Sequence, residues 1–176
     1  MRASLSVLLF SAFLMNLAGF VVIAFLAVYL SNTLHYSATQ TATILSLMVL
    51  SSKELPLLTG ILGDKYGYKR VMSVGLVTRG TGFIVLVFTP PFFWTAIAAI
   101  LLGIGMACYE SSALALFSSE PQEKKRKVAF TYLDLALNGG TITGPLFGGL
   151  LLLFDPRYPF LISGLFFSPS SSFNCP

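Results

Sequence analysis

Long apolar segments separated by short polar breaks constrain this chain more than any other feature of its sequence. A helix of roughly 20 mostly apolar residues crosses the hydrocarbon core of a bilayer. Segments of that kind are expected as membrane spans at about 5–29, 41–62, 71–89, 93–117 and 129–153. A helix satisfies its own backbone hydrogen bonds in lipid, and these runs lack the alternation of barrel strands. The sequence therefore predicts an all-α, polytopic bundle of membrane helices.

Composition favours lipid as the surrounding solvent and gives no support to nucleic acid as a partner. Only 10% of the residues are charged and 55% are hydrophobic, whereas a soluble domain carries roughly 25% charged residues. The formal net charge of +4 arises mainly in short loops between apolar segments. Basic residues in such loops indicate how the protein is oriented in the membrane.

The distribution of lysine and arginine predicts that orientation. Arg2 and the basic loops 65–70 and 124–127 would share one side of the membrane, whereas the opposite loops hold only Arg157. Loops rich in lysine and arginine stay in the cytoplasm. We therefore expect a multi-pass protein of the cell (inner) membrane whose N-terminus is cytoplasmic.

The segment after the fifth span departs from this pattern. Tyr158–Phe167 begins like a further span, but a stretch of serine and proline follows at 168–172. Ten helical residues rise only about 15 Å, half of the hydrocarbon core. We therefore expect a membrane bundle over residues 1–167 with an incomplete sixth helix, and an irregular polar tail over 168–176. Either the sixth span lacks its end or the chain is a truncated or frame-shifted product, and we favour truncation.

The most specific local pattern lies between the second and third expected spans. Its residues are Gly60, Gly63, Asp64, Gly67, Lys69 and Arg70. A tight reversal between helices favours glycine where the backbone turns or packs closely. An acidic residue followed by a basic cluster can form charge pairs that are made and broken as parts of the protein move. Basic residues alone would fit a generic cytoplasmic loop, whereas the ordered spacing indicates a functional one.

This ordered pattern resembles the signature of the major facilitator superfamily between its second and third helices. In that family the loop gates the conformational switch, and the resemblance implies that role here for Asp64, Gly67, Lys69 and Arg70. The similarity covers about residues 5–167 and implies the N-terminal six-helix half of a twelve-helix transporter. The expected partners are then a missing C-terminal six-helix half, a small-molecule substrate with protons, and the lipid bilayer.

A second pattern lies in the fifth span, where glycines recur four residues apart around a proline. Its residues are Gly140, Gly144, Pro145, Gly148 and Gly149. Such glycines let helix backbones approach closely in a membrane, and proline bends a helix and frees a carbonyl. The string resembles the antiporter motif of drug:proton exporters, except that Thr131 stands where that motif has a further glycine. The resemblance implies exchange of a substrate against protons.

A third resemblance is partial. Exporters of this branch often carry an arginine in the fourth helix, a few residues before a Gly-x-Gly. Here Gly103 and Gly105 are present, but Ile100 occupies the basic position. Arg79, in the third span, is the candidate to supply that charge instead.

Ionisable residues inside the expected spans are the candidates for coupling. They are Lys53, Glu54, Arg79, Glu110 and Asp134. A charge in hydrocarbon is costly unless it is paired or wetted. Structural ion pairing stays open for Lys53, Glu54 and Arg79, whereas Glu110 and Asp134 have no basic neighbour on their own helix. We therefore favour Glu110 or Asp134 as the group that titrates.

Polar residues also share one side of the fifth span. Asp134, Asn138, Thr141 and Pro145 follow a helical spacing that places them in one stripe. Such a stripe is expected to face water or another helix. Asn16, a single polar residue in the first span, is expected to bond between helices.

These patterns favour a secondary transporter that exports amphipathic drugs or other small molecules in exchange for protons. Uptake of a small metabolite is the alternative within transport, and a truncated, non-transporting membrane fragment is a second class. An enzyme has little support, because the sequence shows neither a nucleophile–base pair nor a metal-ligand cluster. No phosphate-binding loop for ATP is present, and no cofactor is expected.

Overall fold

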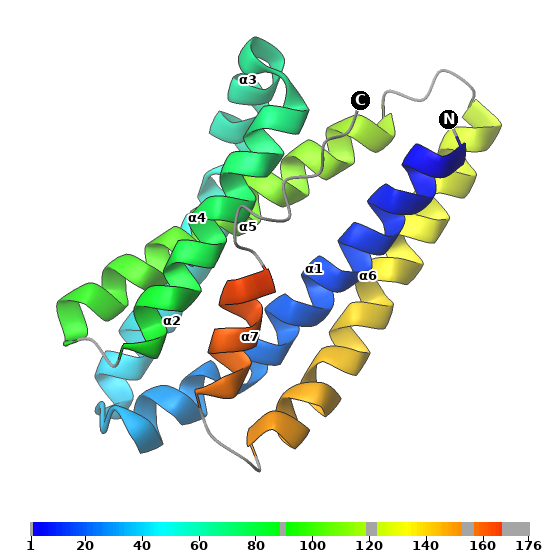
Figure 1. Cartoon of the computed structure of the whole chain (residues 1–176). Coiled ribbons are helices and arrows are strands. Elements are labelled where there is room, and N and C mark those ends of the chain that lie inside the picture. The colour runs from blue at the N-terminus through cyan, green and yellow to red at the C-terminus, as the bar shows by residue number, and fades with distance from the viewer. Residues whose placement is uncertain (1, 89–90, 119–122, 153–156, 167–176) are drawn as a thin grey trace.

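The computed structural model describes residues 2–88, 91–118, 123–152 and 157–166. Every element within these ranges is a helix (Figure 1), which confirms the prediction of an all-α bundle. Phe167 and the expected polar tail, 168–176, lie outside the described residues.

The helices follow the apolar segments of the sequence in order. α1 covers Arg2–Val28 and continues as a short π-helix, η1, over Tyr29–Thr33. The remaining helices are α2 (Ala38–Glu54), α3 (Pro56–Tyr66), α4 (Tyr68–Val87), α5 (Phe92–Ser118), α6 (Glu123–Leu152) and α7 (Tyr158–Phe166). Most differ from the expected spans only by a few residues at their ends.

The second expected span, 41–62, is not a single straight helix. α2 and α3 meet at Leu55 with a bend of 46°. Pro56 begins α3 and has no backbone N–H, so the helical hydrogen-bond pattern is interrupted at this position. The expected span therefore consists of two helices with a bend between them.

Several helices are suited to crossing a membrane. Three stretches are long and apolar enough to do so: Asn16–Thr33, Tyr68–Val87 and Phe92–Ser118. The bent pair α2–α3 makes a fourth if both helices count as one span. The described part of the chain is therefore that of a multi-pass membrane protein.

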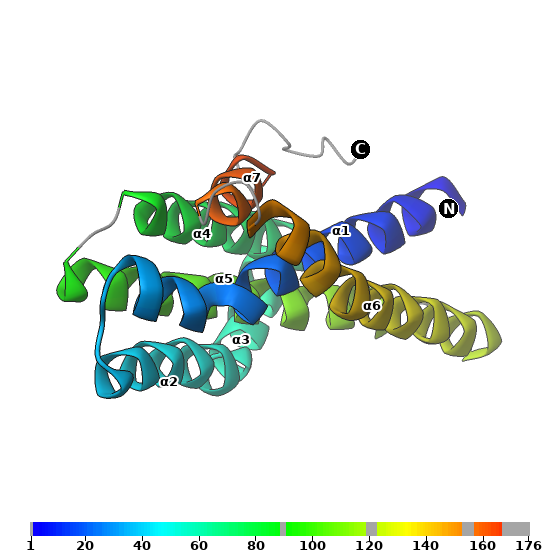
Figure 2. The ribbon, with the colours of Figure 1, turned by 90° about the horizontal axis from the view of Figure 1, so that it is seen from below.

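Two helices stand somewhat apart from the others. Figures 1 and 2 both show α1 and α6 side by side, with the start of α1 near the start of α6. α4 packs along α5, and α2 packs on another side of α5. The short α7 lies against α1 and α4. α7, which contacts α1, α6 and α4, and the contact between α5 and α6 therefore join the α1–α6 pair to the other helices.

Buried side chains fix α7 to the helices around it. The hydroxyl of Tyr29 donates a hydrogen bond of 2.9 Å to the carbonyl of Leu86 on α4, and its ring centroid lies 4.4 Å from that of Phe160. The Oγ of Ser163 donates to the carbonyl of Ala18 on α1 at 3.1 Å. The short sixth segment is therefore an integrated part of the bundle as far as Phe166.

Candidate functional site

The reversal between α3 and α4 is centred on one residue, Gly67. Its φ of 92° lies in the region that glycine adopts without steric cost. The backbone N–H of Gly67 donates to the carbonyl of Gly63 at 2.9 Å, and its own carbonyl accepts from the N–H of Arg70 at 3.1 Å. A residue with a Cβ would be strained here, so this tight turn depends on glycine.

A tyrosine positions the acidic residue of this loop. The hydroxyl of Tyr68 donates a hydrogen bond to the carboxylate of Asp64. The Tyr68 ring packs over Gly63, where an added Cβ would overlap the ring. The ammonium of Lys65 instead lies 5.3 Å from the ring centroid of Tyr66. Tyr68 was not identified from the sequence as the partner of Asp64. The one available signal was the spacing of four residues between them.

The basic residues at the start of α4 remain available for other partners. Lys69 and Arg70 are exposed, and no hydrogen bond or ion pair joins their side chains to another described residue. Gly60 has open space where a Cβ would lie. In this conformation the loop therefore presents free cations beside an oriented carboxylate.

Arg79 is buried where α1, α4 and α5 meet. Its side chain is only 5% exposed. On α1, a Cβ at Gly19 would overlap Nη2 of Arg79; on α5, a Cβ at Gly105 would lie 2.7 Å from the Cβ of Arg79. The guanidinium carbon lies 5.8 Å from the ring centroid of Phe83, and the carboxylate of Glu110 attracts the charge through space. Two glycines on neighbouring helices thus make room for a buried cation.

Glycines also bring the backbones around Arg79 close together. A Cβ at Gly75 on α4 would lie 2.9 Å from the carbonyl oxygen of Gly105 on α5, and one at Gly82 would lie 3.1 Å from that of Ala98. A Cβ at Gly103 would lie 3.1 Å from the backbone nitrogen of Ser52 on α2. Gly103 and Gly105, noticed in the sequence as a partial motif, therefore lie where α5 contacts α2 and α4.

Three glycines of the antiporter-like string face α1. A Cβ at Gly140 would lie 2.8 Å from the backbone nitrogen of Leu17, and one at Gly144 would lie 3.0 Å from that of Val21. A Cβ at Gly148 would lie 2.9 Å from the carbonyl oxygen of Val21. Each of these positions excludes a larger side chain at the present helix separation.

The other members of the string differ. A Cβ at Gly149 would meet only Cζ of Phe25, at an ordinary distance of 3.7 Å. Pro145 lies inside α6 and lacks the N–H that would otherwise bond to the carbonyl of Thr141. Close packing therefore requires the glycines at i, i+4 and i+8 but leaves Gly149 free.

Polar contacts reinforce the α1–α6 pair. Nδ2 of Asn16 on α1 donates to the carbonyl of Leu137 at 3.0 Å, and Oγ1 of Thr141 donates to the same carbonyl at 2.9 Å. Further along the expected stripe, Asp134 and Asn138 are exposed, and Nδ2 of Asn138 donates to the Asp134 carbonyl at 2.9 Å. The stripe thus runs from the edge of the α1 contact onto an open face of α6.

The remaining charges of the spans are exposed on the described bundle. These are Lys53, Glu54, Glu110 and Asp134. No hydrogen bond or ion pair joins the side chain of Lys53 or Glu54 to another described residue. The structural pairing that the sequence left open for those two residues is therefore absent in this conformation.

Two hollows lie near these charges. An open groove of about 390 Å³ runs along α2, and a small cavity beside Arg79 is lined by apolar side chains of α1, α2, α4 and α5. Within the ranges that the structure covers, no group of three or more His, Cys, Asp or Glu side chains could hold a metal ion. The described geometry therefore offers charged and apolar surfaces for a small molecule.

Comparison with known families and proteins gives a consistent result. A family model described as Major Facilitator Superfamily matches residues 8–170. The multi-drug resistance efflux pump PmrA of Streptococcus pneumoniae serotype 4 (strain TIGR4) is 31% identical over 174 residues, which are 94% of this chain and 42% of the relative.

Two further relatives carry related names. The methyl viologen resistance protein SmvA of Salmonella typhimurium (strain LT2) is 32% identical over 124 residues, which are 70% of this chain and 25% of that protein. The multidrug resistance protein MdtH of Cronobacter sakazakii is 28% identical over 171 residues, which are 95% of this chain and 42% of that protein. The chain therefore spans less than half the length of these relatives.

Proposed function

The chain belongs to the major facilitator superfamily of transporters, and from this premise we propose that it is the N-terminal half of a proton-coupled exporter of amphipathic drugs or other small molecules. The observation that most favours exchange is the packing of α6 on α1 through Gly140, Gly144 and Gly148. These are residues of the antiporter-like string, and each occupies a position where α1 leaves no room for a side chain. The names of the relatives as efflux and resistance proteins point in the same direction.

In the proposed mechanism, the loop around Gly67 acts as a cytoplasmic gate. Alternating access is the rocking of one half of such a transporter against the other around a central site. Asp64, oriented by Tyr68, and the exposed Lys69 and Arg70 would form charge pairs with the C-terminal half in one state. Rocking breaks these pairs and forms others, so the loop biases the equilibrium between the two states.

Proton coupling is assigned in this proposal to exposed carboxylates on α5 and α6. Glu110 lies within electrostatic reach of the buried Arg79, whereas Asp134 lies on the polar stripe. Protonation of Glu110 would remove its attraction for Arg79, which is held between α1, α4 and α5. A proton on Glu110 would thereby alter the contact between the helices that surround Arg79.

The gate is tested in the complete transporter, reconstituted into liposomes with an imposed proton gradient and an amphipathic fluorescent dye. Asp64→Asn should lower the initial rate of dye transport about tenfold, the effect of losing one charge-assisted interaction. Lys65→Gln is the matched control, because it removes a charge from the same loop at a residue whose ammonium lies over Tyr66. Unchanged transport by Asp64→Asn would remove the gate, and wild-type transport that ignores the gradient would remove proton coupling.

A further inference from the structure

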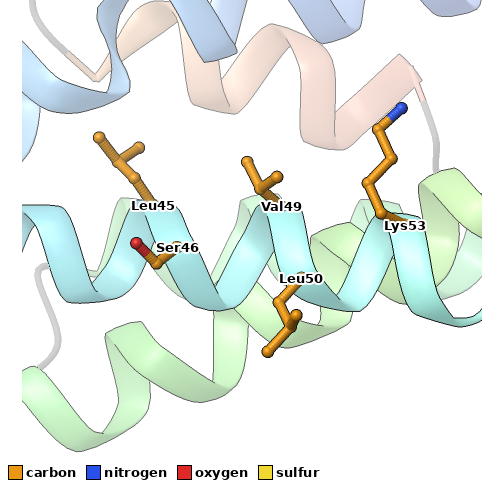
Figure 3. Close-up of a pocket in the computed structure, with 5 residues that line it drawn as sticks. All are labelled: Leu45, Ser46, Val49, Leu50 and Lys53. Carbon is orange, nitrogen blue, oxygen red and sulfur yellow. The ribbon is translucent and has the colours of Figure 1, made fainter.

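The groove along α2 combines an apolar wall with a single cation. It is lined by Leu45, Ser46, Val49, Leu50 and Lys53 and has a volume of about 390 Å³. Figure 3 shows Leu45, Val49 and Lys53 rising from one side of the helix, as their spacing of four residues requires. Leu45 packs against the buried core, whereas Val49 is 51% exposed. The groove therefore begins at the core and opens toward Lys53.

Lys53 has no counter-charge among the described residues. Its side chain is exposed and makes no hydrogen bond or ion pair with them. Glu54 follows directly, but consecutive residues project about 100° apart around a helix, and Glu54 makes no such contact either. An ammonium beside apolar side chains at membrane depth is costly unless an anion or water meets it. The groove thus has an unmatched positive end.

The depth of Lys53 restricts what that anion can be. α2 begins at Ala38, and Lys53 lies about 22 Å further along this helix. That distance is shorter than the hydrocarbon core, which is about 30 Å thick, so Lys53 lies within the core. Phospholipid headgroups lie outside that core. A dissolved amphipathic molecule can carry an anionic group to this depth, whereas a bilayer phospholipid keeps its phosphate at the surface.

A second cation lies at the same height. Gly103 of α5 packs against Ser52, the neighbour of Lys53, and Gly105 packs against Arg79. Two residues of a helix rise only about 3 Å, so Lys53 and Arg79 lie at nearly one level. Glu110 lies about 7 Å further along α5, toward the gating loop. Lys53 and Arg79 therefore place two cations near the level of the groove. Glu54 lies at the same level but projects from another side of α2, and Glu110 lies closer to the gating loop.

We propose that this groove is a subsite for amphipathic organic anions, with the apolar body of the molecule against Leu45 and Val49 and its carboxylate or sulfonate on the ammonium of Lys53. The inference rests on the proposed function in one respect, since it takes the bound molecule to be part of what the exporter carries. An organic cation would instead be repelled at Lys53 and drawn toward Glu54 or Glu110.

Two dyes that share one ring system separate charge from hydrophobicity. The probes are 8-anilinonaphthalene-1-sulfonate and the uncharged N-phenyl-1-naphthylamine. Their fluorescence is titrated against the 176-residue chain in nanodiscs of zwitterionic phosphatidylcholine, with empty nanodiscs subtracted. Lys53→Gln should weaken binding of the sulfonate about tenfold, the effect of losing a charge-assisted contact, and should leave the uncharged dye unchanged. Lys53→Arg should keep most of the sulfonate affinity.

The controls distinguish the groove from general surface charge. Lys65→Gln removes one positive charge outside the groove and should leave both dyes unaffected. Val49→Asn should weaken both dyes, because it disrupts the apolar wall that they share. Retained binding of the uncharged dye shows that the Lys53→Gln chain is folded. Equal loss of both dyes in Lys53→Gln, an unchanged sulfonate affinity, or an equal effect of Lys65→Gln would overturn the proposal.

The outcome is independent of the test of export. Binding is measured on the chain by itself and needs neither a proton gradient nor a second half. Selective sulfonate binding without gradient-driven transport would retain the subsite and remove the exporter. Gradient-driven transport without selective sulfonate binding would retain the exporter and remove the subsite.

Discussion

The guanidinium of Arg79 on α4 occupies the space that Gly19 leaves on α1, so closely that a Cβ on Gly19 would overlap Nη2. Gly105 of α5 makes similar room beside the Cβ of Arg79. A buried arginine in a membrane bundle needs partners that offset its desolvation, and the Phe83 ring and the Glu110 carboxylate both act on this one. Arg79 therefore stays the candidate for the charge that the sequence lacks at Ile100.

Gly19→Ala should displace this guanidinium and destabilise the bundle. Overpacking a well-filled interior costs about 1–3 kcal/mol. The cost here should lie at the lower end of that range, because the group displaced is the end of the flexible Arg79 side chain. The measurement is the free energy of unfolding of the purified chain in detergent, followed by circular dichroism as denaturant is added.

A double-mutant cycle identifies the cause of that loss. In an Arg79→Met background the flexible side chain can yield, so Gly19→Ala should cost less than it does in the wild type. Gly60→Ala is the control, because its Cβ would meet nothing within 4 Å and alanine favours a helix. Equal costs of Gly19→Ala in both backgrounds would show that Arg79 is not the group displaced.

What the sequence reveals depends on how local the interaction is. The spans Tyr68–Val87 and Phe92–Ser118 follow from runs of apolar residues, and their positions were predicted within a few residues. The contact between Gly19 and Arg79 depends on which helices become neighbours, and nothing in either helix predicts its partner. Sequence therefore places the helices well and their contacts poorly.

The candidate site shows the same division. The turn at Gly67 and the common face of the α6 glycines follow from local spacing, so both features could be anticipated. That the α6 glycines meet α1, and that Tyr68 binds Asp64, required the folded arrangement. The bend at Leu55 was within reach of the sequence, since Pro56 lacks the N–H that a continuous helix needs.

Gly144→Val should destabilise the chain more than the identical substitution at Gly149. A valine at Gly144 would press on the backbone of α1, because even an added Cβ would lie 2.9 Å from the carbonyl oxygen of Leu17. A Cβ added at Gly149 would meet only Cζ of Phe25, at a distance of 3.7 Å. The expected difference in unfolding free energy is about 1–3 kcal/mol, measured in detergent by denaturant titration. Similar losses at both positions would mean that the α1 contact does not limit side-chain size.

The N-terminus and the loop around Gly67 should lie in the cytoplasm. Clusters of lysine and arginine remain on that side of a membrane, and Lys69 and Arg157 stand at opposite ends of the described helices. Single cysteines replace Lys69 or Arg157 in a background in which Cys108 and Cys175 are changed to serine. In intact cells an impermeant maleimide should label Arg157→Cys readily and Lys69→Cys only after the membrane is permeabilised. Labelling of Lys69→Cys in intact cells would reverse the orientation.

The 176-residue chain should not transport by itself. Alternating access requires two halves that rock around a site between them, and this chain aligns with at most 42% of the relatives named above. Reconstituted alone into liposomes with an imposed proton gradient, it should move amphipathic dye no faster than empty vesicles do. Adding a complementary six-helix half should restore transport, and Asp64→Asn should then reduce it.

Two copies of the chain are the alternative to two different halves, since many large apolar side chains are exposed, among them Leu135, Ile142 and Leu146 of α6. Gradient-dependent dye movement by the chain alone, rising with the square of its density in the vesicles, would show that a pair of copies forms the transporter and would refute this prediction.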